Sequence, residues 1–254
     1  NSGDLSVAGN GLWLQAIVSE SEMDEVDNIA GFSADSSGFA LGYGRELNDG
    51  LTVGGAITWS ESEIDGDDAS RSTLDSDMLL LSIYGQYEWD QWYANAVVSY
   101  GTGSNDAERS VGSDQLTADY DSSMLSLQAQ LGYDLVLGDN WLLTPHAGLR
   151  VSQVETDSYK EEGGVSALAM GSHTLDTFEL GAGVQLAKEF AVGDSVLTPH
   201  LDLAVYYDFE GDKIQTSGRF VVGGDSFTVT GAEYSETSYT ATVGVDWDFA
   251  DTHS

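Results

Sequence analysis

The stretch from Leu79 to Gly101 alternates between apolar and polar residues with a period of two, and this alternation restricts the possible folds most strongly. Successive side chains of a β-strand point to opposite faces. One face of its second half is therefore apolar and the other mostly polar: Trp92, Ala94, Ala96, Val98 and Tyr100 against Tyr93, Asn95, Ser99 and Gly101. A membrane-spanning strand needs this pattern, but a strand of a soluble sandwich is also half apolar. The choice between them depends on how often the pattern recurs.

The pattern recurs along the whole chain and predicts about ten strands. The connections between them alternate between short and long. Short turns are expected at Asn48, Asp90, Asp139 and Asp194, and long acidic loops at Glu20 to Asn28, Ser60 to Asp77, Thr102 to Ser122, Glu155 to Thr174 and Glu210 to Glu233. Outer-membrane barrels have short periplasmic turns and long external loops, whereas a soluble sandwich has no reason to place every long loop at one end. We therefore predict an all-β, antiparallel, up-and-down transmembrane β-barrel with short periplasmic turns and long acidic external loops.

The charge balance excludes one class of partner. Among 254 residues there are 8 Lys and Arg against 43 Asp and Glu, a formal net charge of −35. Binding of nucleic acid is not expected, because affinity for phosphates comes largely from basic side chains. The chain has no cysteine, so it has neither disulfides nor thiolate chemistry. No apolar run reaches the roughly 18 residues that suggest a transmembrane helix.

A series of short segments in strand order resembles the C-terminal translocator (β) domain of type V autotransporters. The segments are Gly11 to Gln15, Gly38 to Tyr43, Asp49 to Gly54, Ile83 to Tyr87, Trp92 to Asn95, and Leu-Thr-Pro at Leu143 and Leu197. The resemblance implies a bacterial outer-membrane barrel that anchors and exports an N-terminal passenger. It also implies folding by the barrel-assembly machinery and contact with the lipid bilayer, lipopolysaccharide and the passenger segment. The alternative is a stand-alone outer-membrane pore or adhesin barrel.

The two ends of the chain depart from the family pattern of twelve strands. Trp247 to Phe249 is similar to the family's tenth strand, and Ala250 to Ser254 to the turn after it. We expect residues 1–10 to be a lead-in, the tail of a lumenal linker helix, and residues 11–254 to be a barrel that lacks its last two strands. In the other interpretation the barrel closes at ten strands, with Tyr239 to Phe249 paired to the first.

The alternation also assigns side chains to the two faces. We expect an outward girdle of aromatic residues facing lipid and an inward set of polar residues facing the lumen. The girdle residues are Tyr43, Trp59, Trp92, Tyr100, Trp141 and Trp247. The lumen-facing residues are Gln86, Asn95, Gln128, Arg150, Glu179 and Asp202.

Other residue groups suggest sites, but each has a simpler interpretation. Asp65, Asp67 and Asp68 could bind calcium, yet their spacing is not that of an EF-hand, and a solvated acidic surface is favoured. His146 and His200 are expected to form lumenal hydrogen bonds rather than a metal site, and Arg150 an ion pair with Glu179 or Asp134, or a contact with the passenger. His173 lies near Asp176 and Glu179, but no Gly-x-Ser-x-Gly or Ser-x-x-Lys motif is present. We therefore predict no enzyme activity, no cofactor and no metal.

Overall fold

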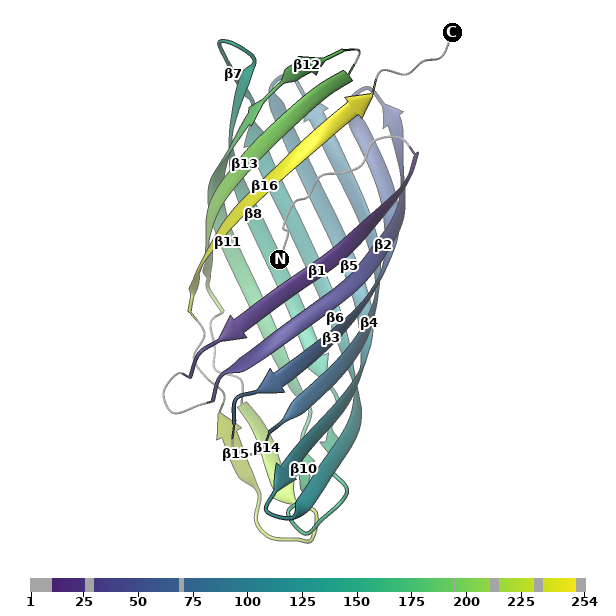
Figure 1. The fold of residues 1–254 in the computed structure, drawn as a ribbon, viewed down its shortest axis with the longest axis vertical. Helices are drawn as coiled ribbons and strands as arrows, with labels where there is room; N and C mark the ends of the chain where they lie inside the picture. The colour runs from purple at the N-terminus through teal and green to yellow at the C-terminus, as the bar shows by residue number, and fades with distance from the viewer. Residues whose placement is uncertain are drawn as a thin grey trace.

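The structure is a computed structural model, and it describes residues 11–25, 30–68, 71–193, 195–210, 215–230 and 235–249. Within these residues, long antiparallel strands form one sheet that curls into a barrel (Figure 1). The long strands are β1 Gly11–Met23, β2 Phe32–Asn48, β3 Leu51–Gly66, β4 Thr73–Trp89, β5 Trp92–Val111, β6 Asp114–Tyr133, β8 Trp141–Thr156, β11 His173–Lys188, β13 Ser195–Asp208 and β16 Thr237–Phe249. Each pairs with its neighbour in the chain, so the up-and-down prediction is confirmed.

Apolar side chains cover most of the outside of the barrel, whereas polar or small side chains face its inside. Large apolar side chains on outward positions are well exposed, including Leu12 at 75%, Val18 at 86% and Ile83 at 74%. The most buried positions are mainly alanines, tyrosines and polar side chains such as Asn95, Ser99, Thr144 and His146. This arrangement inverts the usual distribution of a water-soluble protein and fits lipid on the outer surface. The described part of the chain contains no helix long and apolar enough to cross a membrane.

At one end of the barrel the described residues form short turns at three of the expected places, Asn48, Asp90 and Asp139, whereas Asp194 lies outside the described residues. Gly50, Asp90, Asp139 and Asn140 have positive φ there, from 54° to 83°, as tight hairpin turns require. Two short strands extend long ones at this end: β7 Leu135–Leu137 pairs with β8, and β12 Phe190–Val192 pairs with β13. We call this the short-turn end; it is at the top of Figure 1.

At the opposite end, much of what the sequence suggested as loops is strand. β3 continues as far as Gly66, and β4 begins already at Thr73. β5 and β6 form one long hairpin that turns at Gly112 and Ser113. Two other connections contain a separate four-stranded sheet of β9 Tyr159–Lys160, β10 Leu168–Met170, β14 Gln215–Phe220 and β15 Phe227–Thr230, at the bottom of Figure 1. We call this the long-loop end.

The outer face of the long-loop end carries a row of carboxylates that crosses the strands. Glu20, Asp35, Glu63, Asp75, Asp106 and Asp119 come from β1 to β6 in turn, and each is paired directly opposite the next. All six side chains are exposed. Directly opposed like charges destabilise a sheet, so this acidic collar, as we call the row, lies where water and ions can screen it.

Aromatic rings inside the barrel lie across glycines of the neighbouring strands. A side chain at Gly42 would collide with the ring of Trp13, one at Gly54 with Tyr84, and one at Gly181 with Tyr206. Trp13 in turn donates a hydrogen bond from Nε1 to the Tyr84 hydroxyl, at 2.7 Å. The glycines are therefore needed for ring packing against the inner wall, not only for chain flexibility.

The two edge strands remain apart in the described residues. β1 pairs only with β2, and β16 pairs only with β13 among the long strands. Residues of both edge strands line the same inner cavity, including Ile17 and Ser19 from β1 and Ser238 and Thr240 from β16. The pairing of Tyr239–Phe249 with the first strand, which the alternative of closure at ten strands requires, is therefore not seen in the described part of the sheet.

Candidate functional site

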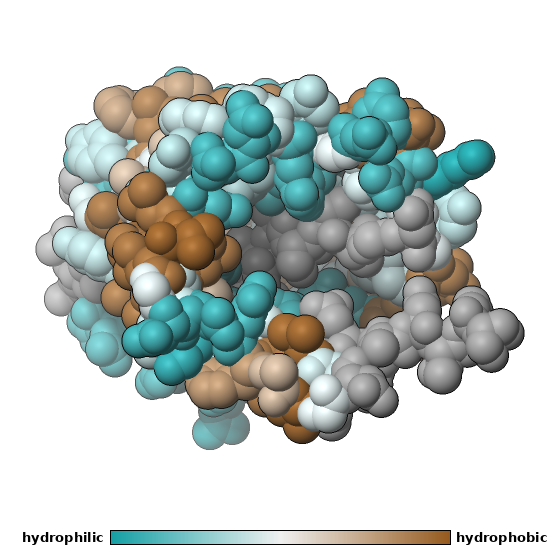
Figure 2. Space-filling model, turned by 90° about the horizontal axis from the view of Figure 1, so that it is seen from above, coloured by the Kyte–Doolittle hydropathy of each residue, from teal (hydrophilic) through white to brown (hydrophobic). Residues whose placement is uncertain are grey.

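A cavity of about 930 Å³ occupies the middle of the barrel. Three of the residues expected to face the lumen, Gln128, Arg150 and Glu179, line it together with small hydroxyl side chains such as Ser126 and Thr177. Figure 2, seen from the short-turn end, shows hydrophilic and hydrophobic residues side by side around the rim of the barrel. A wide cavity with charged and hydroxyl side chains can hold water or a polar chain. It is less suited to a compact apolar ligand, which needs a mostly apolar pocket.

The cation expected in the lumen, Arg150, makes two contacts, and its acidic partner makes a third. Arg150 lies 3.7 Å from a carboxylate oxygen of Glu179, which pairs with it across β8 and β11. The Arg150 guanidinium also stacks 3.7 Å from the ring centre of Tyr206, a cation–π contact. Ser238 of β16 donates a hydrogen bond to Glu179 at 3.5 Å. Arg150 thus pairs with Glu179, whereas Asp134 accepts a hydrogen bond from Thr144.

Two histidines link different strands through acidic partners, His146 across β11 and His200 to the adjacent β16. His146 Nε2 lies 2.7 Å from Asp202, and its Nδ1 lies 2.9 Å from the Gln130 amide. His200 lies 3.2 Å from Asp246 of β16. The lumen-facing residue Asp202 is therefore engaged with His146, and the two histidines bind different partners. Among the described residues, no three His, Asp or Glu side chains are placed to hold a metal ion.

The other residues expected to face the lumen or to form the aromatic girdle differ in their exposure. Asn95 is buried at 8% exposure, and Gln86 donates a hydrogen bond to Glu88. The aromatic residues expected in the girdle are exposed: Tyr43 at 55%, Trp59 at 37%, Trp92 at 41%, Tyr100 at 53% and Trp141 at 37%. Trp247 lies in β16, but its side chain is outside the described residues.

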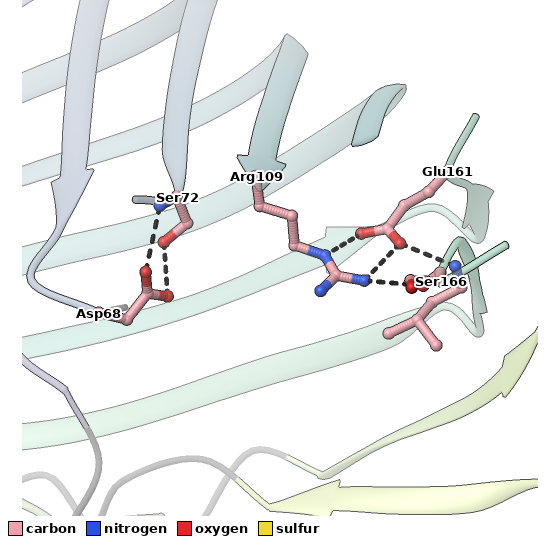
Figure 3. A network of polar contacts seen from close by, with 6 residues as sticks. Asp68, Ser72, Arg109, Glu161 and Ser166 are labelled. Atoms are coloured by element: carbon pink, nitrogen blue, oxygen red, sulfur yellow. Dashed lines mark hydrogen bonds and ion pairs between the residues drawn. The ribbon is translucent and has the colours of Figure 1, made fainter. Parts of the chain in front are cut away.

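A segment at the long-loop end, residues 157–170, is fixed to β5 by a bidentate ion pair; we call it the strap. Arg109 of β5 donates from Nε and Nη2 to the two oxygens of Glu161, at 2.5 and 2.6 Å (Figure 3). It also donates to the carbonyl of Ser166, at 3.4 Å, while the Leu168 amide donates to Glu161 at 2.7 Å. Glu161 is only 9% exposed. The Arg–carboxylate fork joins the strap firmly to the barrel wall.

Backbone and aromatic contacts fix the strap further. Thr117 of β6 and Glu162 exchange two backbone hydrogen bonds, at 2.9 and 3.1 Å. The rings of Tyr120 and Tyr159 stack 4.4 Å apart and nearly parallel. Burial, and to a smaller extent the Glu161 carboxylate, raise the pKa of Tyr159 above its ordinary value. The strap is therefore a packed part of the structure rather than a loose loop.

Sequence reasoning did not find Arg109 or Glu161, because they are 52 residues apart and belong to no motif. The one available signal was scarcity: with only 8 Lys and Arg in the chain, each cation is a candidate for a specific partner.

The residues considered for catalysis do not form a common site. Asp176 bonds to Gln153 and Glu179 contacts Arg150, whereas Nδ1 of His173 is buried without a hydrogen-bond partner in the described structure.

Comparison with known proteins gives a consistent result. A family model described as autotransporter β-domain matches residues 12–254. Outer membrane protein A of Rickettsia conorii is 26% identical over 96% of this chain but only 13% of its own length. The IgA-specific serine endopeptidase autotransporter of Neisseria gonorrhoeae is 27% identical over 77% of this chain and 12% of its own length. The chain thus spans only about an eighth of the length of these two curated relatives.

Solved structures show the same fold. The translocator domain of the autotransporter NalP from Neisseria meningitidis has a TM-score of 0.72 at 18% identity, covering 97% of this chain and 91% of that one. The β domain of the Bordetella autotransporter BrkA has a TM-score of 0.61 at 15% identity, covering 94% of this chain and 98% of that one.

Proposed function

Because the chain belongs to the autotransporter β-domain family, as a match over residues 12–254 shows, we propose that it exports a passenger polypeptide attached ahead of residue 1. Its place in the bacterial outer membrane and its role as a translocator domain follow from the family. The observation that supports export most directly is the polar cavity of about 930 Å³ inside a barrel whose outer surface is apolar. An extended polypeptide needs such a water-lined passage, because lipid would leave its backbone polar groups unsatisfied.

Membership of this family also indicates which partners the barrel would have. The barrel-assembly machinery would insert the strands, and lipid together with lipopolysaccharide would surround the outer face. The exposed aromatics Tyr43, Trp59, Trp92, Tyr100 and Trp141 would lie at the membrane interfaces, where amphipathic rings are favoured. Gln86, Asn95, Gln128, Arg150, Glu179 and Asp202 would line the lumen. The domain itself would catalyse no reaction, and any enzymatic activity would belong to the passenger.

Two further strands would close the barrel in this proposal. β1 and β16 each leave one edge unpaired within the described sheet. An open edge in lipid is costly, because each unpaired backbone group costs several kcal/mol there. Strands that pair with β16 on one side and β1 on the other would remove both edges. The lead-in, residues 1–10, lies outside the described residues.

The test is surface exposure of the passenger. The intact protein, with an epitope tag in the passenger, is produced in a Gram-negative host, and intact cells are treated with protease. We expect the tag to be removed from intact cells while the barrel stays protected. A folded barrel with no passenger at the cell surface would contradict export. Ion conductance by that barrel in planar bilayers would then favour the alternative, a stand-alone pore.

A further inference from the structure

The inner faces of β2 to β4 form an uncharged wall toward the long-loop end. The inward positions there are small, hydroxyl or aliphatic: Ala34, Ser36 and Gly38 on β2, Ser60, Ser62 and Ile64 on β3, and Leu74, Ser76 and Met78 on β4. Most outward positions of the same segments are acidic: Asp35, Glu61, Glu63, Asp65, Asp75 and Asp77. Charge is thus kept off one side of these strands and concentrated on the other.

Three hydroxyl groups of this neutral wall form hydrogen bonds with side chains of the barrel interior. Ser36 and Ser62 share a hydrogen bond of 2.8 Å between β2 and β3, and Ser76 donates to Asn105 at 2.9 Å. The opposite side of the lumen differs, since Arg150 and Glu179 lie there. A wall of paired hydroxyls and small apolar groups gives a passing chain no fixed charge to bind or repel.

The neutral wall leads to a cavity of about 590 Å³ beside the strap. Phe32, Ile64 and Leu74 line it from the barrel side, and Tyr159 and Glu161 from the strap side. Its lining also includes the charged residues Asp68, Glu108, Arg109 and Glu161, and each of them is hydrogen-bonded within the protein; Glu108 accepts from the Gln115 amide at 3.3 Å. Asp68 accepts hydrogen bonds from the backbone and side chain of Ser72, at 3.2 and 2.9 Å, and Arg109 is bonded to Glu161 (Figure 3).

A second cavity, of about 560 Å³, offers a different way past the strap. It lies between the strap and the small sheet, and its lining includes Asp119, Lys160, Met170 and Arg219. None of the hydrogen bonds or ion pairs that fix the strap neutralises Lys160 or Arg219. This route would expose a passing chain to charges of both signs, which would bind its own charged residues.

We propose that the exported polypeptide leaves the barrel along the neutral wall of β2 to β4 and through the cavity beside Leu74, while the strap stays docked. This proposal rests on the proposed function and names the surface that the passenger contacts. An unfolded passenger contains every kind of side chain, so its path must bind no particular kind strongly. The neutral wall meets this need, whereas the cavity lined by Lys160 and Arg219 does not.

Photo-crosslinking tests the path. A photoreactive amino acid replaces either Leu74 or, as the matched control on the other side of the strap, Met170, in the intact protein. The passenger carries a disulfide-closed loop that stalls it in the barrel. We expect several-fold more barrel–passenger adduct from position 74 than from position 170. Equal yields, or more adduct from position 170, would overturn the path. Failure of the unaltered passenger to reach the surface would instead contradict export itself.

A disulfide lock tests whether the strap stays docked. Thr117 and Glu162 form a hydrogen-bonded antiparallel bridge, a spacing of about 5.5 Å between Cα atoms that a disulfide can span. The chain has no cysteine of its own, so the double variant T117C/E162C contains one defined barrel pair. We expect the oxidised variant to display its passenger within twofold of the reduced one. Loss of display on oxidation, restored by reductant, would show that the strap must open.

Discussion

A ring on one strand lying over a glycine of the next strand is the recurring contact inside this barrel. At Gly183 the neighbour is the imidazole of His146, which reaches across β11 to Asp202 on β13. A Cβ at this position would lie 2.5 Å from a ring carbon of His146 and 2.7 Å from the Cβ of Ala204. Neither can move without disturbing a packed wall, so the His146–Asp202 link depends on the absence of one methyl group.

We therefore predict that Gly183→Ala destabilises the barrel by about 1–3 kcal/mol, the usual cost of overpacking. The matched control is Gly138→Ala in a turn, where a Cβ would have no neighbour within 4 Å. Urea unfolding of the barrel in detergent micelles measures both. An equal effect of the two substitutions would show that the ring does not depend on this glycine.

An arginine should disturb assembly more on the outward face of a strand than on the inward face. Ala96 is exposed on the outer face of β5, whereas Ser126 of β6 lines the inner cavity. We expect Ala96→Arg to cost about 2–4 kcal/mol near the middle of the bilayer and to reduce the folded fraction in the outer membrane. Ser126→Arg places the same charge in the lumen and should assemble more fully. Heat-dependent gel mobility reports the folded fraction of each.

At the scale of elements, the strap depends on one ion pair. Glu161→Gln would leave the Arg109 guanidinium, whose side chain is only 26% exposed, without its charged partner. Breaking a buried pair from one side typically costs 3–5 kcal/mol, and about half of that is expected here because Arg109 is partly solvated. Amide hydrogen exchange of residues 159–168 should quicken while that of β11 stays unchanged. The double variant R109M/E161M should recover part of the protection, since it leaves no unpaired charge.

The strap also has a predicted response to high pH. Its Tyr159 has a raised pKa, caused chiefly by burial, so the neutral phenol is favoured in the folded state. A group with a raised folded pKa contributes stability below its unfolded value, about 10 for tyrosine, and loses it as the pH rises through the folded value. Burial raises the pKa of the neighbouring Tyr120 to about 12, so ultraviolet titration should show a late phase from both tyrosines, and Tyr159→Phe should reduce its amplitude without removing it. A variant with a late phase of unchanged amplitude would contradict the assignment.

The sequence predicts the membrane half of each strand better than the loop half, for a physical reason. In β3, Ile57 and Trp59 point outward between Thr58 and Ser60, and this apolar-out pattern signals lipid. Beyond Trp59 the outward positions become Glu61, Glu63 and Asp65, while Ile64 points inward. The period of two continues, but its sense is reversed, and the reversal resembles an irregular acidic loop. The Arg109–Glu161 pair had no local signal, because only the tertiary fold brings the two residues together.

At the scale of the whole molecule, charge is the dominant constraint. A formal net charge of −35 on 254 residues makes the folded chain repel itself, most strongly where carboxylates face each other in the acidic collar. Salt reduces this repulsion, since the screening length falls from about 30 Å at 0.01 M to about 3 Å at 1 M. We predict that the thermal unfolding temperature in uncharged detergent rises with sodium chloride over this range. An unchanged or falling temperature would mean that the carboxylates are already compensated.

The acidic collar surrounds β1 to β6 just beyond the apolar band, so it also affects how copies of the protein share a membrane. Two barrels that approach each other through these strands present their collars to each other before their apolar walls can touch. Each barrel thus has an effective radius in the membrane plane that exceeds its physical one by about a screening length, roughly 8 Å at 0.15 M salt. The ionic strength of the medium outside the cell would then set how densely the barrels crowd, and cells in fresh water would keep them farther apart than cells in brine.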